Sequence, residues 1–180
     1  MKMNTLSYGL MALLTDESYT GYELMIKMKL FWHVTHSSIY PVLSALEKEK
    51  LVEYRSVEQS DKPDKKIYSV TDKGIKLVIE WLKGEVSEPK VKDEMLLKIY
   101  CINLLDSEDA IKLIEKREKI FIKKLEYYNN QLNIQVNADE TKNIKSPHFS
   151  KYILILKAIS IANEEVNWCK QIIKIYKNRA

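Results

Sequence analysis

The chain has 180 residues, which suits one domain or a small domain with an appended segment. Hydrophobic residues make up 46% of the chain and charged residues 30%, so it can bury a core and is not disordered throughout. Gly and Pro number only four each, which argues against an all-β sandwich and a Gly-rich phosphate loop. The net charge of +4 permits a polyanionic partner without requiring one, and the basic excess is not concentrated in the first half of the chain. The composition therefore predicts a mostly helical protein.

Helical periodicity dominates the first 50 residues. Apolar residues share one face of a helix over 4–14, and Thr20 with Glu23 predicts a capping box for a helix from 20 to about 30. Ser37 or Ser38 is expected to cap a third helix, which places Pro41 in its first turn. The opposite faces of this third helix are apolar and polar, so it can pack on a core and still present side chains to solvent.

After residue 51, the hydrophobic pattern changes from a helical period to the two-residue alternation of a β-strand. Alternating residues predict strands over 52–57 and 67–70, joined by a polar nine-residue tip over 58–66. Thr71 or Asp72 is expected to cap a fourth helix, with a core face of Ile75, Val78, Ile79 and Leu82. Three helices, a two-stranded hairpin and a fourth helix form the winged helix-turn-helix arrangement. We place this domain at residues 1–84 and a second domain at 85–180.

The second domain shows only helical patterns, over 93–105, 107–132 and 149–177, with a polar loop over 133–146. The middle helix has near-heptad spacing, in which Glu118 fills a core slot. The last helix carries two apolar stripes, one of which can pack on the preceding helix and the other on a second copy of the chain. Either stripe could face that copy. The side chains expected at the dimer interface are Phe121, Leu125, Ile155, Ile159, Val166 and Ile173.

The segment FWHVTHSSIYPVL over 31–43, followed by Leu46-Glu47 and Leu51-Val52, resembles the PadR family of transcriptional regulators. TGYE over 20–23, KIYSVT over 66–71 and the later Gly74 match the same family in the same order. The second half resembles the longer subfamily, in which a helical C-terminal domain dimerises the protein. The resemblance implies a homodimeric winged-helix protein, often a repressor, that binds a pseudo-palindromic DNA operator. Some members respond to small aromatic molecules.

One position departs from the family pattern. The family usually has Gly before the Leu-Val that opens the first strand, and this chain has Lys50. Gly would serve there as the left-handed residue that ends the preceding helix. Lysine can adopt that conformation at a cost of about 1 kcal/mol, so we expect the fold to survive.

A recognition helix must project donors and acceptors into the major groove. The third helix offers hydroxyls but no arginine on its outer face, so phosphate contacts are expected to dominate over direct base readout. Lysines near the hairpin tip can reach a neighbouring phosphate. The predicted DNA-binding residues are Thr20, Tyr22, His36, Ser37, Ser38, Tyr40, Ser44, Lys62, Lys65 and Lys66. Two alternatives stay open: the serines are only helix caps, and the lysines only neutralise Asp61 and Asp64.

The three tryptophans, Trp32, Trp81 and Trp168, are candidates for an aromatic effector site near the junction of the two domains, with plain core packing as the alternative. His33, His36 and His148 show no ligand spacing, so neither a metal nor another cofactor is expected. No catalytic motif such as GxSxG or HExxH occurs, and an enzyme is disfavoured.

The remaining expectations concern location and an alternative function. Cys101 and Cys169 lie in apolar helical patterns and are expected to be buried free thiols, which fits a reducing cytosol. No apolar run approaches the roughly 18 residues of a membrane span, so we predict a cytoplasmic protein. The alternative to a DNA-binding repressor is a winged helix that docks onto another protein without binding DNA.

Overall fold

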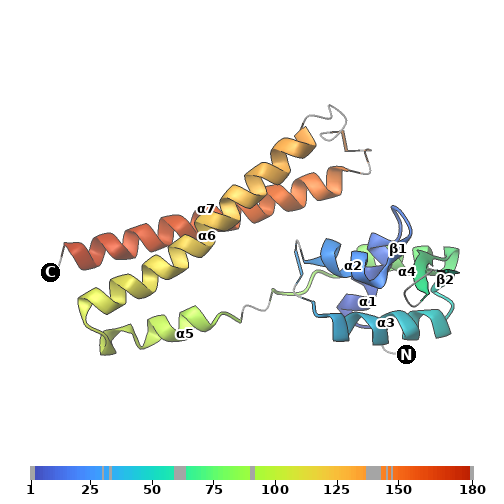
Figure 1. Ribbon diagram of the computed structural model, residues 1–180, viewed down its shortest axis with the longest axis horizontal. Coiled ribbons are helices and arrows are strands. Elements are labelled where there is room, and N and C mark those ends of the chain that lie inside the picture. The colour runs from blue at the N-terminus through green and yellow to red at the C-terminus, as the bar shows by residue number, and fades with distance from the viewer. Residues whose placement is uncertain are drawn as a thin grey trace. The chain divides into compact units, whose positions relative to one another are not determined.

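The computed structural model describes residues 3–29, 31–32, 34–58, 64–89, 92–136, 143–144, 146 and 148–178 (Figure 1). The chain divides into two compact units, Met1–Ser87 and Glu88–Ala180. The division lies three residues beyond the predicted boundary. The assignment of one unit to DNA binding and the other to dimerisation remains a prediction.

The first unit has the element order expected of a winged helix. Its elements are α1 (Thr5–Leu13), β1 (Tyr19–Thr20), α2 (Gly21–Met28), α3 (His36–Lys48), β2 (Val52–Val57), β3 (Lys65–Val70) and α4 (Asp72–Leu82). Asn4 caps α1 by accepting a hydrogen bond from the Ser7 amide, and Thr71 caps α4 by accepting one from Gly74. The mostly helical fold class is confirmed.

Apolar faces of all four helices meet in one core. Leu10, Leu24, Ile39, Leu43 and Leu46 are fully buried there. The predicted core face of α4 is wrong in part: Val78 is buried, whereas Ile79 and Leu82 are exposed. The helix is turned so that Gly74 meets Leu51, the residue before β2, where an added Cβ would lie 2.3 Å from the Leu51 carbonyl oxygen. This close approach orients α4 and leaves Ile79 and Leu82 outside the core.

The sheet has three strands in the order β1-β3-β2, all antiparallel. The two-residue β1 was not predicted because two residues show no periodicity. It adds Tyr19 and Thr20 beside Tyr68 and Ile67. The predicted tip was too long, since β3 begins at Lys65 and pairs its first residue with Val57. Lys65 and Lys66 are therefore strand residues.

Lys50 adopts the left-handed conformation expected from its place in the sequence, with φ of 57°. The Leu51 amide donates to the Leu46 carbonyl at 2.9 Å and the Lys50 amide to the Glu47 carbonyl at 2.8 Å. These two bonds form a Schellman motif, in which glycine normally occupies the Lys50 position. The motif ends α3 and turns the chain into β2.

In the described part of the second unit, all regular secondary structure is helical. It contains α5 (Glu94–Tyr100), a short 3-10 helix (Ile102–Leu104), α6 (Ser107–Val136) and α7 (Phe149–Lys177). The expected single helix over 93–105 is thus interrupted at Cys101. Helices α6 and α7 lie side by side as a long antiparallel pair (Figure 1). Helix α6 continues four residues into the segment predicted as a loop, since it ends at Val136.

The α6–α7 pair uses one of the two predicted stripes of α7. Ile155, Ala162, Val166, Cys169 and Ile173 of that stripe are buried within the single chain. Ile155, Val166 and Ile173 were assigned to the dimer interface, but their side chains are already covered without a partner. Phe121, Leu125 and Ile159 are half-buried. The other stripe is more open; its members are Leu154, Ala158, Ile161, Trp168 and Ile172, with Ile161 45% exposed.

The cysteines differ from each other. Cys169 is buried as predicted, and burial raises the pKa of its thiol to about 11. Cys101 is exposed, contrary to the prediction, because the helix breaks at this residue. Within the described residues, no helix has the length and apolar character needed to cross a membrane.

Candidate nucleic-acid interface

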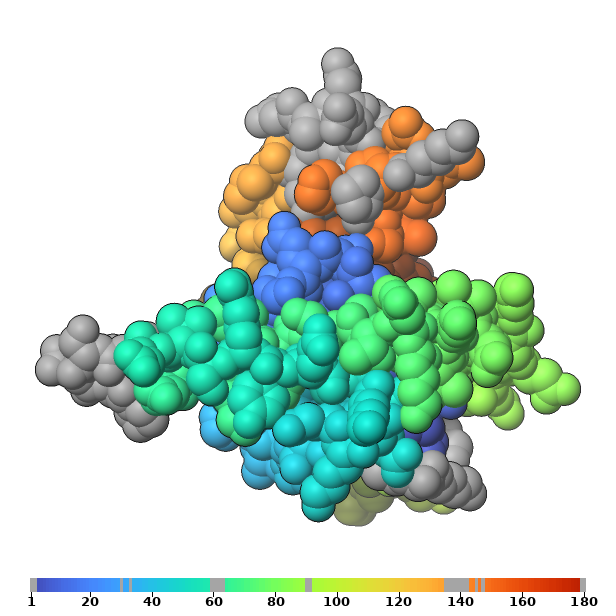
Figure 2. Space-filling model, turned by 90° about the vertical axis from the view of Figure 1, so that its right-hand side faces the viewer, coloured from blue at the N-terminus to red at the C-terminus, as the bar shows by residue number. Residues whose placement is uncertain are grey.

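The outer face of α3 is the centre of the candidate site. His36, Ser37, Tyr40, Ser44 and Lys48 are all exposed there, at helical spacing opposite the buried Ile39, Leu43 and Leu46. Within the described part of the chain, the hydroxyls of Tyr40 and Ser44 form no hydrogen bond to another protein group. Figure 2 views the first unit from the end at which α3 finishes, with α3 in cyan and the strands β2 and β3 in teal and green reaching out to one side.

Neither serine is the N-cap residue of α3, contrary to the prediction, although Ser38 takes part in a capping box from the third helical position. The helix begins at His36, and Thr35 is the N-cap residue. The Ser38 hydroxyl accepts from the Thr35 amide at 3.2 Å and donates to the Thr35 carbonyl at 2.8 Å. Ser37 shares a hydrogen bond of 3.0 Å with the Thr35 hydroxyl and stays exposed. Ser38 is thus occupied in the first turn, whereas Ser37 remains accessible to a ligand.

The early start also changes the place of Pro41. It lies in the second turn of α3 instead of the first. Proline has no amide hydrogen, so the carbonyl of Ser37 lacks its usual helical donor.

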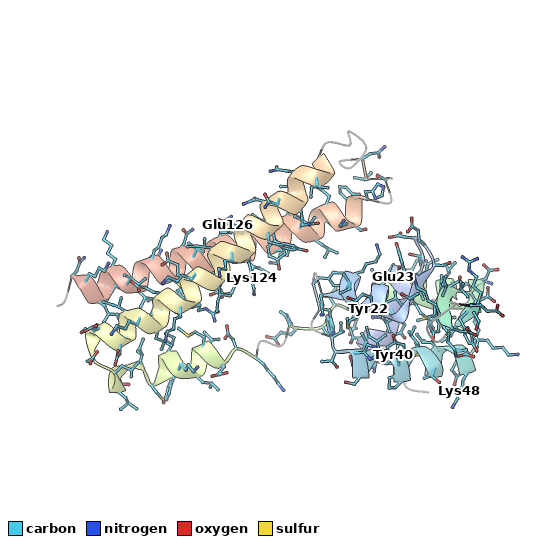
Figure 3. All side chains as sticks on the ribbon, in the orientation of Figure 1. Tyr22, Glu23, Tyr40, Lys48, Lys124 and Glu126 are labelled. Atoms are coloured by element: carbon cyan, nitrogen blue, oxygen red, sulfur yellow. The ribbon has the colours of Figure 1, made fainter. Side chains whose placement is uncertain are left out.

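Tyr40 is held in place from two sides. Its ring centroid lies 4.4 Å from that of His36, with the planes tilted by 41°. On the other side, a Cβ added to Gly21 would lie 2.9 Å from the ring, so only glycine allows α2 to approach this closely. Tyr22, 59% exposed, follows on α2 (Figure 3). Helix α2 therefore fixes the position of the largest side chain on the α3 face.

Thr20 is a structural residue in this site. Its hydroxyl donates to the Glu23 carboxylate at 2.7 Å and accepts from the Glu23 amide at 3.2 Å, which completes the predicted capping box. Hydrogen bonds from the Thr20 backbone and hydroxyl hold the pKa of Glu23 below its usual value. Thr20 is only 6% exposed. It was assigned to DNA binding, but its hydroxyl is buried and engaged within the chain.

The hairpin lysines lie on opposite faces of the sheet, because successive strand residues alternate. Lys66 shares the core-side face with Tyr54, Ser56 and Tyr68. Lys65 lies on the other face, and its ammonium is 3.9 Å from the Glu23 carboxylate. Lys62 lies outside the described residues. The predicted lysine cluster therefore separates into residues with different surroundings.

Lys66 belongs to the same surface as α3. Its ammonium lies 3.8 Å from the centroid of the Tyr54 ring, and Tyr54 contacts Tyr68 at 5.7 Å between centroids. Tyr68 is 5% exposed, and burial raises the pKa of its phenol while Glu47 and Tyr40 of α3 act on it electrostatically. We call the surface of Ser37, Tyr40, Ser44, Lys48 and Lys66 the α3–wing surface.

The three tryptophans have separate environments. Trp81 stacks on Tyr8 with ring centroids 5.0 Å apart and planes 6° from parallel, so α4 and α1 hold it within the first unit. Trp32 is 46% exposed after α2. Trp168, in the second unit, lies 5.9 Å from the Arg117 guanidinium. An effector site that includes these residues stays a prediction.

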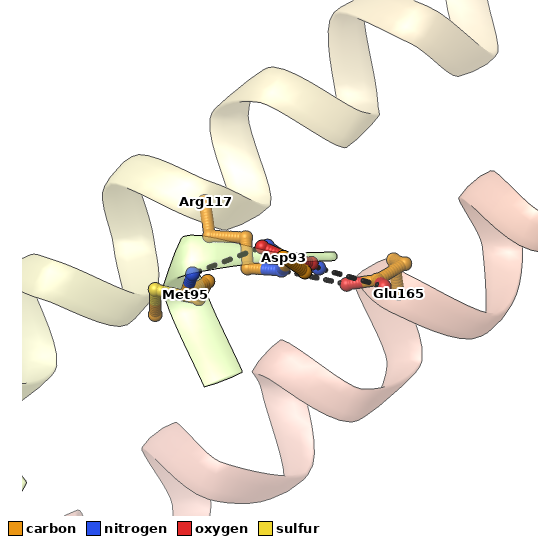
Figure 4. A network of polar contacts seen from close by, with 4 residues as sticks. All are labelled: Asp93, Met95, Arg117 and Glu165. Atoms are coloured by element: carbon orange, nitrogen blue, oxygen red, sulfur yellow. Dashed lines mark hydrogen bonds and ion pairs between the residues drawn. The ribbon is translucent and has the colours of Figure 1, made fainter. Parts of the chain in front are cut away.

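The sequence reading missed the main polar network of the second unit. Arg117 of α6 donates to Asp93 at 2.6 and 3.1 Å and to Glu165 of α7 at 2.7 and 2.8 Å (Figure 4). Its side chain is only 12% exposed. Hydrogen bonding to Arg117 lowers the pKa of Asp93. The sequence pattern placed Glu118, the residue after Arg117, at the polar core position. The gap in the heptad spacing was the signal that pointed to a polar residue in this part of α6.

The described residues contain no group of three or more histidine, cysteine, aspartate and glutamate side chains that could hold a metal ion. The α3–wing surface and the adjacent His36 instead offer hydroxyls, ammonium groups and an imidazole to solvent. Such groups suit hydrogen bonding to base edges and phosphates.

Two family models match the chain in succession. Residues 10–79 match the Transcriptional regulator PadR-like family, and residues 91–177 match the family described as Virulence activator alpha C-term. The two matches fall within the two structural units.

Individual relatives cover nearly the whole chain. The Negative transcriptional regulator PadR of Bacillus subtilis (strain 168) is 30% identical over 176 residues, which span 95% of this chain and 97% of the relative. The crystal structure of Bacillus subtilis PadR in complex with operator DNA has a TM-score of 0.86 at 29% identity, covering 97% and 99% of the two chains. The crystal structure of Bacillus subtilis PadR in complex with p-coumaric acid has a TM-score of 0.79 at 27% identity, covering 98% of both.

Proposed function

The chain belongs to the PadR-like family of transcriptional regulators, and from this premise we propose that its α3–wing surface binds operator DNA and represses transcription. The observation that carries the proposal is the exposed face of α3. There, Gly21 and His36 fix the position of Tyr40, and the hydroxyl of Ser44 has no hydrogen-bond partner among the described residues. A second helix of a helix-turn-helix motif places such side chains against base edges in the major groove. The protein is a DNA-binding regulator and not an enzyme.

The electrostatics of the surface favour contacts with phosphate over many base contacts. Lys48 and Lys66 carry its positive charge, and the exposed face of α3 holds no arginine. Arginine supplies the commonest specific contact with guanine, so its absence limits direct readout. We therefore expect most of the affinity to come from phosphates and the specificity from Tyr40, Ser44 and DNA shape.

The active species is a homodimer in this proposal. The stripe of α7 with Leu154, Ile161 and Trp168 is less buried than the stripe that packs on α6, and a second copy would cover its exposed part, which includes Ile161. A two-fold dimer places two recognition helices about 34 Å apart on one face of DNA and reads a pseudo-palindrome. A mass near twice 21.2 kDa at micromolar concentration is expected.

We also propose that the protein is cytoplasmic and that a small aromatic ligand modulates its binding to the operator. The relative from Bacillus subtilis has been crystallised with p-coumaric acid and, separately, with operator DNA. In this chain Trp32, Trp81 and Trp168 are the aromatic candidates for such a site. A planar ligand would stack on an indole face and lower the affinity for the operator.

The proposal is tested by fluorescence anisotropy with the DNA upstream of the protein's own gene and with unrelated DNA of equal length. We expect tighter binding to the upstream DNA and a steep loss of affinity between about 50 and 200 mM salt. A protein that docks onto another protein through apolar surface would bind neither DNA. Equal affinity for both duplexes would argue against operator recognition at this site.

A further inference from the structure

The hairpin holds one lysine against an aromatic ring. Tyr54 pairs with Tyr68, and Ser56 pairs with Lys66, on the core-side face of β2 and β3. Tyr54 and Lys66 are therefore diagonal neighbours across the strands, a separation that long side chains bridge. The Lys66 ammonium lies 3.8 Å from the Tyr54 ring centroid, well inside the range of a cation–π contact.

The ring beneath the ammonium has a firm support. Tyr68 is 5% exposed and its centroid is 5.7 Å from that of Tyr54, in a tilted arrangement. Tyr54 is 36% exposed, so part of its surface remains for Lys66.

We propose that Tyr54 is a positioning residue: its ring holds the Lys66 ammonium beside α3, ready to contact a DNA phosphate. This inference rests on the proposed DNA-binding function. A free lysine samples many rotamers, and a phosphate contact must restrict them at a cost in conformational entropy. Lys66 is exposed, so the side of the ammonium that faces away from the ring stays open to a phosphate. By restricting the Lys66 side chain before DNA binds, Tyr54 lowers the conformational entropy that Lys66 loses when it contacts a phosphate.

The neighbouring lysine lacks this arrangement. Lys65 lies on the opposite face of β3, and its nearest charged partner is the Glu23 carboxylate at 3.9 Å. Its charge is partly offset by that carboxylate, and no aromatic ring among the described residues lies under it. The proposal therefore concerns Lys66 alone, although the two residues are adjacent in sequence.

The test compares Tyr54→Leu, Tyr54→Phe, Lys66→Ala and the double variant Tyr54→Leu/Lys66→Ala in the full chain. The probe is a duplex enriched from a randomised library by the wild-type protein, and affinity is measured over a salt series. Lys66→Ala should reduce the salt slope by about 0.9 per bound wing, the effect of one lost phosphate contact. Tyr54→Leu should weaken binding roughly two- to five-fold, the range of an exposed cation–π contact.

The matched controls decide whether Tyr54 acts through Lys66. Tyr54→Phe keeps the ring and should bind like the wild type, and Tyr54→Leu should have no further effect once Lys66 is alanine. In the free protein, NMR should show ring-current shifts of the Lys66 side-chain protons that disappear in Tyr54→Leu and persist in Tyr54→Phe. Thermal unfolding checks that each variant is folded.

Several results would overturn the inference. Additive effects of Tyr54→Leu and Lys66→Ala, or tighter binding by Tyr54→Leu, would show that the ring does not prepare Lys66 for DNA. Equal losses in Tyr54→Phe and Tyr54→Leu would exclude the ring as the positioning group. A wild-type protein that enriches no duplex would refute the proposed function and this inference with it, whereas the other results refute the inference alone.

Discussion

Replacing Lys50 by glycine should stabilise the first unit. Lys50 has φ of 57° in a complete Schellman motif, and its side chain is exposed. The Lys50 carbonyl, which accepts from the Thr71 hydroxyl at 2.9 Å, is retained in the variant. The substitution therefore removes the backbone strain of a side chain in the left-handed region and leaves the surrounding hydrogen bonds in place.

The magnitude follows from two opposing contributions. A non-glycine residue in the left-handed conformation costs about 1–2 kcal/mol. Glycine adds conformational freedom to the unfolded chain, which costs about 0.4–1 kcal/mol. We expect a net gain of about 0.5–1 kcal/mol in the free energy of unfolding of the first unit. For a unit of this size, that corresponds to a rise in Tm of roughly 2–8 °C.

Native-state amide hydrogen exchange is the appropriate assay, because it reports the first unit separately from the second. The amides of Leu43 and Leu46 in the core of α3 should exchange more slowly in Lys50→Gly. Two controls fix the interpretation: Lys50→Ala should give no gain, since alanine has the same strain, and Lys48→Gly should lower stability at the last helical residue. Equal stabilisation by Lys50→Ala would refute strain at this position as the cause.

Three further predictions concern the polar network and the contact of α2 with α3. Arg117→Met should destabilise the second unit by about 3 kcal/mol, because Asp93 and Glu165 lose their shared cation, and circular dichroism in urea would measure the loss; an unchanged unfolding midpoint would contradict the structural role of Arg117. The folded-state pKa of Asp93 is lowered, so its contribution to stability is present above its unfolded pKa of about 3.9 and is lost as the pH falls below that value. In Asp93→Asn, the free energy of unfolding should therefore fall less steeply toward low pH than in the wild type. The same pH dependence in both proteins would exclude Asp93 as a cause of the loss of stability in acid. Gly21→Ala should displace the Tyr40 ring and weaken operator binding several-fold, whereas Gly9→Ala, which meets only the flexible end of Met28, should not; equal affinities of the two variants would show that the position of Tyr40 does not matter for binding.

Local signals made most of the first unit predictable. The capping box of Thr20 and Glu23, the period-two strands and the left-handed Lys50 each depend on residues close in sequence, and each is present. The errors occurred where tertiary contacts determine which residues are buried. Ile79 continued a regular apolar pattern, but the approach of Gly74 to Leu51 turned α4 so that Ile79 is exposed.

The candidate site was predictable as a set of residues and less so as a surface. The exposure of Tyr40 and Ser44 followed from helical periodicity. The separation of Lys65 from Lys66 depended on where β3 begins, which a polar segment does not reveal. The Arg117 network joins residues 24 and 48 positions apart, so no local pattern could have identified its partners.

The most direct test of the proposed function compares Tyr40→Ala with Tyr127→Ala in binding to the enriched duplex and to unrelated DNA. Both tyrosines are exposed, Tyr40 on α3 and Tyr127 on α6. We expect Tyr40→Ala to lose roughly ten-fold or more in affinity for the enriched duplex, as for one lost base contact, and to bind unrelated DNA nearly as before. Tyr127→Ala should match the wild type on both duplexes. Equal affinities of Tyr40→Ala and the wild type for the enriched duplex would contradict recognition of the operator by α3.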